Sequence, residues 1–268
     1  MIDIAISNIA WNNNYFEEAL SILKEEKIKK IELSLNKIFK EPILEPENSF
    51  IDLKNLLQKY DLEVVATHSL FYTKKNYNLF DREGYKILNN YLLGIEKIMK
   101  IFNSNKIIFG SGSCRNIFDA KNDNVKVFIN FIQDFFEKSE NKNSQILIEP
   151  LSKVETNFIN NCNEAMSIIK VINSNRLNLH IDLKSSMNEN EDFDFIFKNY
   201  FNYIKHIHIS DNNLEAPSKK SGYHQSFSDI LKKYNYKGCV SIEMKEINPW
   251  SKKELSSTLN FVKEIYLT

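Results

Sequence analysis

Short runs of apolar and β-branched residues alternate along the chain with longer stretches whose apolar residues recur at helical spacing. The short runs, which we predict to be strands, lie at residues 2–7, 30–35, 63–68, 106–110, 146–150, 177–183, 206–210 and 239–244. The longer stretches, which we predict to be helices, follow them at 16–27, 50–60, 84–102, 125–138, 162–172, 193–201, 227–234 and 251–266. The pattern therefore predicts eight consecutive strand–helix units.

Eight such units in 268 residues have the count and size of a (β/α)8 barrel. A doubly wound open sheet is the competing architecture, and it usually has a glycine-rich turn after its first strand. The segment SNIAWNNN after the first predicted strand contains no glycine. The Gly/Ser-rich segment FGSGSCRN at 109–116 is read as either an ordinary turn or a phosphate contact. We predict one α/β domain, a (β/α)8 TIM barrel, over residues 1–268.

Charge and composition indicate which classes of binding partner this chain is not expected to have. The 35 basic and 35 acidic residues balance, and 43% of the residues are hydrophobic, so a large core is expected and nucleic-acid binding is not. No apolar run approaches the roughly 18 residues of a membrane helix, and the first residues do not resemble a secretory signal. The three cysteines show no metal-binding spacing. We expect a cytoplasmic protein that binds neither nucleic acid nor a membrane.

Residues capable of chemistry lie at the ends of the last four predicted strands, which in such a barrel is the reactive face. They are Glu149, Asp182, His208 and Glu243. Each alone reads equally well as a polar cap on a strand. Burying three carboxylates together in an apolar cavity would cost roughly several kcal/mol of desolvation free energy per unpaired charge. One divalent cation bound between them removes that cost. Oxygen ligands with one imidazole suit Mn²⁺, Mg²⁺, Co²⁺ or Zn²⁺.

The motifs IEPLSKVETN, HIDLKSS, HIHISDNN and VSIEMK carry a resemblance to the xylose isomerase-like barrel superfamily, which extends over essentially the full length of the chain. In its ketose 3-epimerase and hydroxypyruvate isomerase-like branches, the residues matching Glu149, Asp182, His208 and Glu243 bind one divalent metal. The resemblance also implies that Glu149 and Glu243 are the catalytic acid/base pair.

The implied activity begins with removal of the proton next to a substrate carbonyl. A metal that holds the substrate oxygens would stabilise the resulting enediolate. Return of the proton to the opposite face gives an epimerase, and return to the neighbouring carbon gives an aldose–ketose isomerase. A dehydratase or lyase acting on an inosose or keto acid is the enzymatic alternative, because it begins with the same step. A barrel that binds a sugar without turnover is the alternative from another class.

The resemblance further implies substrate contacts for His68 and Glu155. Trp11 and Phe71 lie in loops that could wall the pocket, and His224 and Lys220 lie in the loop after the seventh strand. A solvated or packing role is the competing interpretation for each.

Two family positions differ in this chain. Ser185 stands where a substrate-binding His is common, and the loop after His208 has no Arg. Both differences indicate a substrate unlike the usual free ketohexoses. The endonuclease branch of the superfamily is disfavoured, because several histidines of its zinc cluster are missing here, including the one that Ser185 replaces.

His206 and His208 are two residues apart, so both are expected to face the barrel interior, with His208 nearer the open end. His180 stands in the same relation to Asp182. We therefore predict His180 and His206 as a polar layer that supports the site from below. Family members are often dimers or tetramers, so a homo-oligomer is possible from the resemblance.

Overall fold

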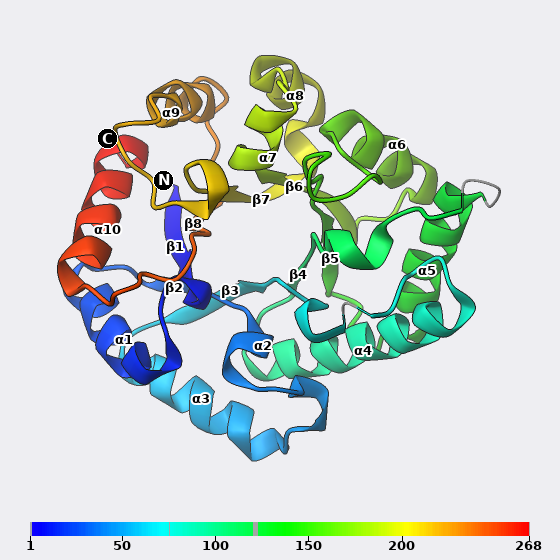
Figure 1. Cartoon of the computed structure of the whole chain (residues 1–268), viewed down its shortest axis with the longest axis horizontal. Coiled ribbons are helices and arrows are strands. Elements are labelled where there is room, and N and C mark those ends of the chain that lie inside the picture. Colours follow the sequence, from blue (N-terminus) through cyan, green and yellow to red (C-terminus); the bar gives the residue numbers. More distant parts are fainter. Residues whose placement is uncertain (1, 75, 120–122, 268) are drawn as a thin grey trace.

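Eight parallel strands close into a barrel in sequence order (Figure 1). The structure is a computed structural model that describes residues 2–74, 76–119 and 123–267. Its strands are β1 (Asp3–Ser7), β2 (Lys30–Leu33), β3 (Glu63–Thr67), β4 (Lys106–Phe109), β5 (Gln145–Ile148), β6 (Leu177–Asp182), β7 (Ile204–Ile209) and β8 (Cys239–Ile242). The predicted (β/α)8 barrel is confirmed.

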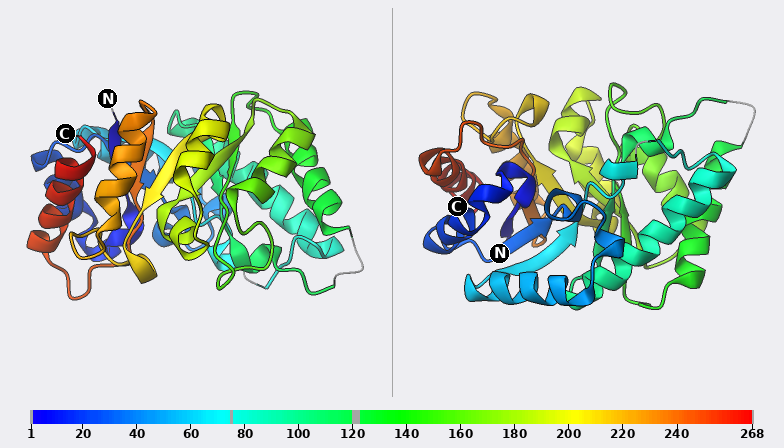
Figure 2. Two further views of the ribbon diagram at one scale, coloured as in Figure 1. Left: turned by 90° about the horizontal axis from the view of Figure 1, so that it is seen from above. Right: turned by 60° about the horizontal axis from the view of Figure 1, so that its bottom comes forward.

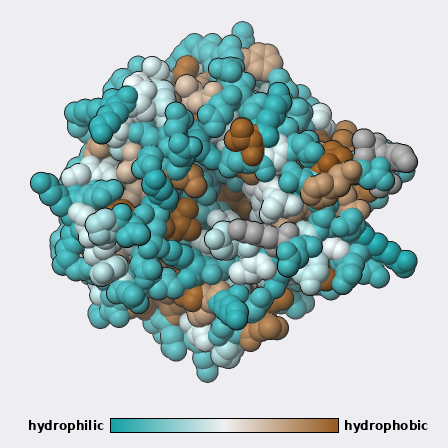
Figure 3. All heavy atoms as spheres, in the orientation of Figure 1, coloured by the Kyte–Doolittle hydropathy of each residue, from teal (hydrophilic) through white to brown (hydrophobic). Residues whose placement is uncertain are grey.

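Helices surround the strands and run along the outside of the barrel (Figure 2). They are α1 (Phe16–Glu25), α2 (Leu35–Ile38), α3 (Glu47–Lys59), α4 (Arg82–Ile101), α5 (Asn124–Lys138), α6 (Cys162–Ile172), α7 (Leu183–Asn188), α8 (Phe193–Tyr200), α9 (Tyr223–Lys233) and α10 (Lys252–Tyr266). None of the helices in the described ranges combines the length and the apolar character that a membrane crossing requires. Hydrophilic residues dominate the face shown in Figure 3.

The short helices α2 and α7 were not predicted from the sequence, and each corrects a strand boundary. The predicted strand at 30–35 included Leu35, whereas β2 ends at Leu33 and α2 begins at Leu35. The predicted strand at 177–183 included Leu183, whereas β6 ends at Asp182 and α7 begins at the next residue. The Asp182 side chain accepts a hydrogen bond from the Lys184 backbone N–H. A carboxylate at this position satisfies a free N–H of the first helical turn, so Asp182 ends the strand and caps the helix.

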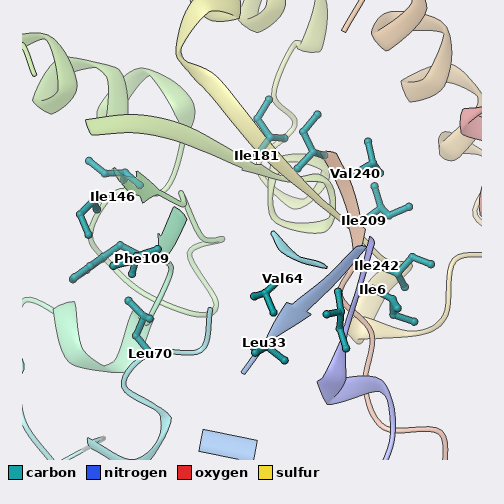
Figure 4. Close-up of a cluster of buried hydrophobic side chains, with 14 of the residues drawn as sticks. Ile6, Leu33, Val64, Leu70, Phe109, Ile146, Ile181, Ile209, Val240 and Ile242 are labelled. Carbon is teal, nitrogen blue, oxygen red and sulfur yellow. The ribbon is translucent and has the colours of Figure 1, made fainter. Parts of the chain in front are cut away.

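The main core lies between the strands and the helices. Alternate strand residues such as Ile6, Phe109, Ile181 and Ile242 are fully buried there, and Figure 4 shows them with their neighbours. The Phe109 ring packs edge-on against Phe128 of α5, with ring centroids 5.5 Å apart. This alternation fixes which side chains face the barrel interior, because successive residues of a strand point to opposite faces.

The barrel interior is apolar on one side and polar on the other. Ala66, Ile108 and Leu147 form a separate buried apolar cluster on β3, β4 and β5. The strands β6 and β7 pair so that His180 lies opposite His206 and Asp182 lies opposite His208. The predicted layering of the histidines is therefore present, with two imidazoles one step below the strand ends.

Candidate active site

A cavity of about 400 Å³ opens at the carboxyl ends of the strands. Loops after β3 and β4 form one side of it, and the ends of β5, β6 and β8 form the other. Its lining residues are His68, Ser69, Phe71, Tyr72, Gly110, Ser111, Gly112, Ser113, Glu149, Leu151, Glu155, Asp182, Lys184, Leu214 and Glu243. The cavity therefore contains all three carboxylates that the sequence places at strand ends.

His208 brings two of these carboxylates together. Its Nδ1 lies 3.2 Å from Glu149 Oε1 and 3.2 Å from Glu243 Oε2. The three ligand atoms lie within 4.8 Å of one another. Two carboxylate oxygens and one imidazole nitrogen at such spacing are donors that suit a divalent ion.

Asp182 faces the same cavity but does not join that group of ligand atoms among the described residues. Its Oδ1 accepts a hydrogen bond from the Lys184 backbone N–H at 3.0 Å, and its Oδ2 accepts one from the Ser185 hydroxyl at 3.0 Å. Asp182 is thus held in place by the first turn of α7. Each carboxylate oxygen has a second lone pair, so these contacts leave Asp182 able to bind an ion.

The glycine-rich segment after β4 makes room for Glu149. A methyl group on Gly110 would lie only 1.5 Å from Glu149 Oε2, so no other residue fits beside this carboxylate as it stands. The buried Arg115 guanidinium donates hydrogen bonds to the backbone oxygens of Phe109, at 3.2 Å, and Glu149, at 2.8 Å. The segment therefore acts as a turn that positions β5 and its glutamate.

Glu32, on β2, is a buried carboxylate of the site region that the sequence analysis did not identify. Its two oxygens lie 2.9 and 3.0 Å from His208 Nε2, and one lies 3.3 Å from His206 Nε2. Alternation within KIEL was the available signal, because it points the glutamate into the barrel. Glu32 thus fixes the His208 ring from the side opposite the cavity, as carboxylates commonly do for metal-binding histidines.

His68 follows the last residue of β3, and its side chain contacts Glu243. Its Nδ1 lies 2.9 Å from Glu243 Oε1, and its Nε2 lies 2.6 Å from the Ser7 hydroxyl oxygen. The side chain is buried and lines the cavity, so the predicted position of His68 at the pocket is present. Its contact with Glu243 restrains that carboxylate from the β3 side.

Burial and charge move the pKa values of the site in opposite directions. Burial, together with the nearby Glu243 and Asp182 carboxylates, raises the pKa of Glu149 to about 7, although the His208 imidazole opposes the shift. Burial also favours the neutral form of Glu243, but the His208 and His68 imidazoles hold its pKa well below the usual range. The two glutamates of one cavity therefore differ in proton affinity, which is typical of acid/base pairs.

The layer below the site contains His180 and His206. The His180 ring centroid lies 4.1 Å from that of His208, and its Nδ1 is 3.5 Å from Glu149 Oε1, too long for a good hydrogen bond. Neither nitrogen of His180 has a hydrogen-bond partner among the described residues. Burial lowers the pKa of His180 well below its usual range, so its ring is neutral.

Other predicted substrate contacts lie at different depths. Phe71 and Glu155 line the cavity, whereas Ser185 is not among its lining residues and its hydroxyl can donate a hydrogen bond to Asp182 Oδ2, at 3.0 Å, or to Glu155 Oε2, at 3.1 Å. Trp11 is fully buried outside the cavity lining and packs edge-on against Phe16. Substrate contact by Trp11 and Ser185 stays a prediction.

The loop after β7 places its side chains away from the cavity, except Leu214. His224 Nε2 lies 2.9 Å from Asp211 Oδ1, and His224 Nδ1 lies 2.7 Å from the Tyr266 hydroxyl. His224 is thus engaged between α9 and α10. Lys220 is likewise not among the described residues that line the cavity.

Comparisons with known proteins agree on one kind of barrel. The profile of the xylose isomerase-like TIM barrel family matches residues 28–265. None of the curated proteins matches the chain significantly in sequence.

Solved structures resemble the fold over nearly its whole length. A 3-keto-D-glucoside 4-epimerase from E. coli is 14% identical, with a TM-score of 0.80 over 98% of this chain and 100% of its own. A D-psicose 3-epimerase from Clostridium cellulolyticum H10 is 13% identical, with a TM-score of 0.80 over 99% of both chains. A D-allulose 3-epimerase from Methylomonas sp. is 15% identical, with a TM-score of 0.79 over 99% of this chain and 97% of its own.

Proposed function

Because the chain belongs to the xylose isomerase-like TIM barrel family, we propose that it is a divalent-metal-dependent isomerase or epimerase of a keto sugar or sugar derivative. One observation carries the proposal. His208 Nδ1 lies 3.2 Å from an oxygen of Glu149 and from an oxygen of Glu243 in a cavity of about 400 Å³. The names of three structural neighbours, all sugar epimerases, support the same class.

The residues that would hold the ion are Glu149, Asp182, His208 and Glu243. Their oxygen and imidazole donors fit Mn²⁺, Mg²⁺, Co²⁺ or Zn²⁺. When bound, such an ion supplies Lewis-acid polarisation of a substrate carbonyl. Glu32 and His68 hold His208 and Glu243 in the orientations that this donor set needs.

Proton transfer falls to the two glutamates. One of them removes a proton from the carbon next to the substrate carbonyl, and the other returns a proton to the opposite face. Glu149 and Glu243 both line the cavity, and their oxygens approach the same imidazole nitrogen. If the second proton is delivered to the neighbouring carbon, the same pair performs aldose–ketose isomerisation.

Substrate contacts are assigned to His68, Phe71 and Glu155, which line the cavity. Leu214 stands in the loop after β7 and presents an apolar side chain there, while Ser185 is engaged with Asp182 and Glu155. Both features support a substrate that differs from the usual free ketohexoses.

Solvent deuterium uptake tests the proposal. D-fructose, D-tagatose, D-allulose, L-ribulose, sugar phosphates and amino sugars are incubated with the protein and Mn²⁺ in D₂O and followed by NMR. We expect deuterium at the carbon next to the carbonyl of an accepted sugar. Elimination of water from the sugar would instead indicate the dehydratase alternative.

Two variants test the two-base mechanism. Glu149→Gln and Glu243→Gln are each expected to abolish deuterium uptake, because each removes a proton-transfer group. Glu137→Gln, on the exposed side of α5, is the matched control and should keep full uptake. Full uptake in either cavity variant would contradict the mechanism.

A further inference from the structure

Lys184 is a buried cation of the cavity that the proposed acid/base chemistry does not use. It is the second residue of α7, two positions after Asp182, and its side chain is 8% exposed. Its Nζ lies 2.9 Å from Glu155 Oε1 and 3.6 Å from Asp182 Oδ2. The ammonium group therefore reaches the cavity between two carboxylates.

The hydrogen bonds of Lys184 are incomplete. An ammonium group has three donors, and the bond to Glu155 is the only one that Nζ makes within the described part of the chain. The distance of 3.6 Å to Asp182 is too long for a good hydrogen bond. A buried charged donor without an acceptor is costly, so a ligand oxygen inside the cavity would satisfy a donor that the described side chains leave open.

The charges around Lys184 indicate which acceptor fits. Glu155 and Asp182 already balance its positive charge, and Glu149 and Glu243 line the same cavity. A phosphate or carboxylate group there would be repelled by these carboxylates, whereas an uncharged oxygen would not be. A hydroxyl group fits both partners, because its oxygen accepts a hydrogen bond from Lys184 and its O–H donates one to Glu155.

We propose that Lys184 and Glu155 together bind one uncharged hydroxyl group of the substrate, which makes Lys184 a specificity-determining residue. The proposal rests on the proposed function, since it takes the ligand to be a sugar. The Lys184 side chain extends from α7 into the cavity lining beside Asp182. The bound hydroxyl is therefore close to the carbons on which the glutamates act.

Calorimetric titration tests this assignment without turnover. D-fructose, D-tagatose, D-allulose and L-ribulose are titrated into the Mg²⁺-supplied protein, followed by analogues of the bound ketose in which each hydroxyl in turn is replaced by hydrogen. Loss of a bond from a charged donor should weaken binding on the order of 10- to 100-fold. We expect Lys184→Met to weaken ketose binding by that factor.

The analogue that lacks the recognised hydroxyl loses the bonds to both Lys184 and Glu155, so it should bind the wild-type protein at least as weakly as the ketose binds Lys184→Met. That analogue should lose little more affinity in the variant, because the bond from Lys184 is already absent. If Lys184 only supports the fold, Lys184→Met would weaken the binding of all analogues equally, and this outcome would overturn the proposal. Lys153→Met, in the neighbouring loop and 75% exposed, is the control and should bind like the wild type.

Two further results separate this proposal from the proposed function. Ketose binding without any deuterium uptake would overturn the function and leave the role of Lys184 to be judged from binding alone. Unchanged binding by Lys184→Met in an exchange-active protein would overturn only the role of Lys184. If none of the four ketoses binds, the sugar phosphate or amino sugar that shows deuterium uptake is titrated in their place, and absence of both binding and uptake for every sugar tested would overturn both proposals. If Lys184→Met does not fold, Lys184→Gln, which keeps a donor for Glu155 but not the charge, takes its place, and its loss should again be confined to ligands that carry the recognised hydroxyl.

Discussion

Both ring nitrogens of His208 face carboxylates. Glu32 lies 2.9 Å from Nε2, and Glu149 and Glu243 lie 3.2 Å from Nδ1. Burial opposes protonation of the ring, but these carboxylates raise the pKa of His208 well above its usual range. The ring is therefore oriented before any ligand arrives, with Nδ1 turned to the two glutamates that line the cavity.

Replacement of Glu32 should weaken ion binding although Glu32 is not itself a proposed ligand. In Glu32→Gln the contact to His208 Nε2 loses its charge, and loss of such a supporting carboxylate typically reduces metal affinity about 10- to 100-fold. Titration of Mn²⁺ into the apoprotein measures the change. Glu63→Gln, at the exposed start of β3, is the control. Equal Mn²⁺ affinity of Glu32→Gln and the wild type would contradict the role of Glu32.

Glu32 and Lys184 show where residue-level inference from the sequence ends. Glu149, Asp182, His208 and Glu243 could be grouped because each stands at a strand end, and strand ends meet in a barrel. Glu32 stands inside a strand and Lys184 inside a helical turn, so their proximity to the site depends on how β2 and α7 pack. Trp11 shows a second limit, because a loop aromatic can turn into the core, and its side chain is fully buried outside the cavity lining.

Most strands and long helices could be predicted because apolar residues recur in each of them at a regular spacing. The predicted and observed bounds of α6 coincide at residues 162–172. α2 and α7 have only four and six residues, too few to show a helical period. α7 nevertheless matters to the site, because its first turn holds Asp182 and carries Lys184.

The contact between α9 and α10 should depend on pH through His224. Burial lowers the pKa of His224, although the Asp211 carboxylate opposes the shift. The unfolded chain therefore binds a proton more readily than the folded protein, and stability falls as pH drops through the unfolded value of about 6.5. The contribution is up to about 1.4 kcal/mol per pH unit. We expect His224→Gln to show a shallower loss of unfolding free energy between about pH 7.5 and 5.5.

Urea unfolding at several pH values measures this slope. Gln225→Asn, on the exposed side of α9, adds and removes no titrating group and should keep the wild-type slope. His180 and His206 remain in both proteins, so their contributions cancel in the comparison. Identical slopes for the wild type and His224→Gln would show that His224 titrates alike in both states.

The whole barrel should be stabilised by the ion that its centre is proposed to bind. A ligand at about 100 times its dissociation constant adds about 2.7 kcal/mol to the unfolding free energy. In a chain of this size that corresponds to roughly 5–10 °C in unfolding temperature. Thermal unfolding with EDTA and with excess Mn²⁺ should therefore differ by this amount.

The Glu149→Gln/Glu243→Gln double variant is the control for that shift. It removes two of the proposed ligands, so its unfolding temperature should not respond to Mn²⁺. If the wild type unfolds at the same temperature with EDTA and with Mn²⁺, the proposed ion site is wrong. The family and the barrel architecture would stand in that case, because they rest on the profile match and the strand order.

Gly110 leaves room that the carboxylate of the next strand occupies. An added methyl group would lie 1.5 Å from Glu149 Oε2, so a larger residue at this position requires the Glu149 side chain to turn away. Such a turn would move a proposed donor atom of the ion site without replacing any proposed ligand. The side-chain volume at position 110 therefore controls where the Glu149 carboxylate can lie.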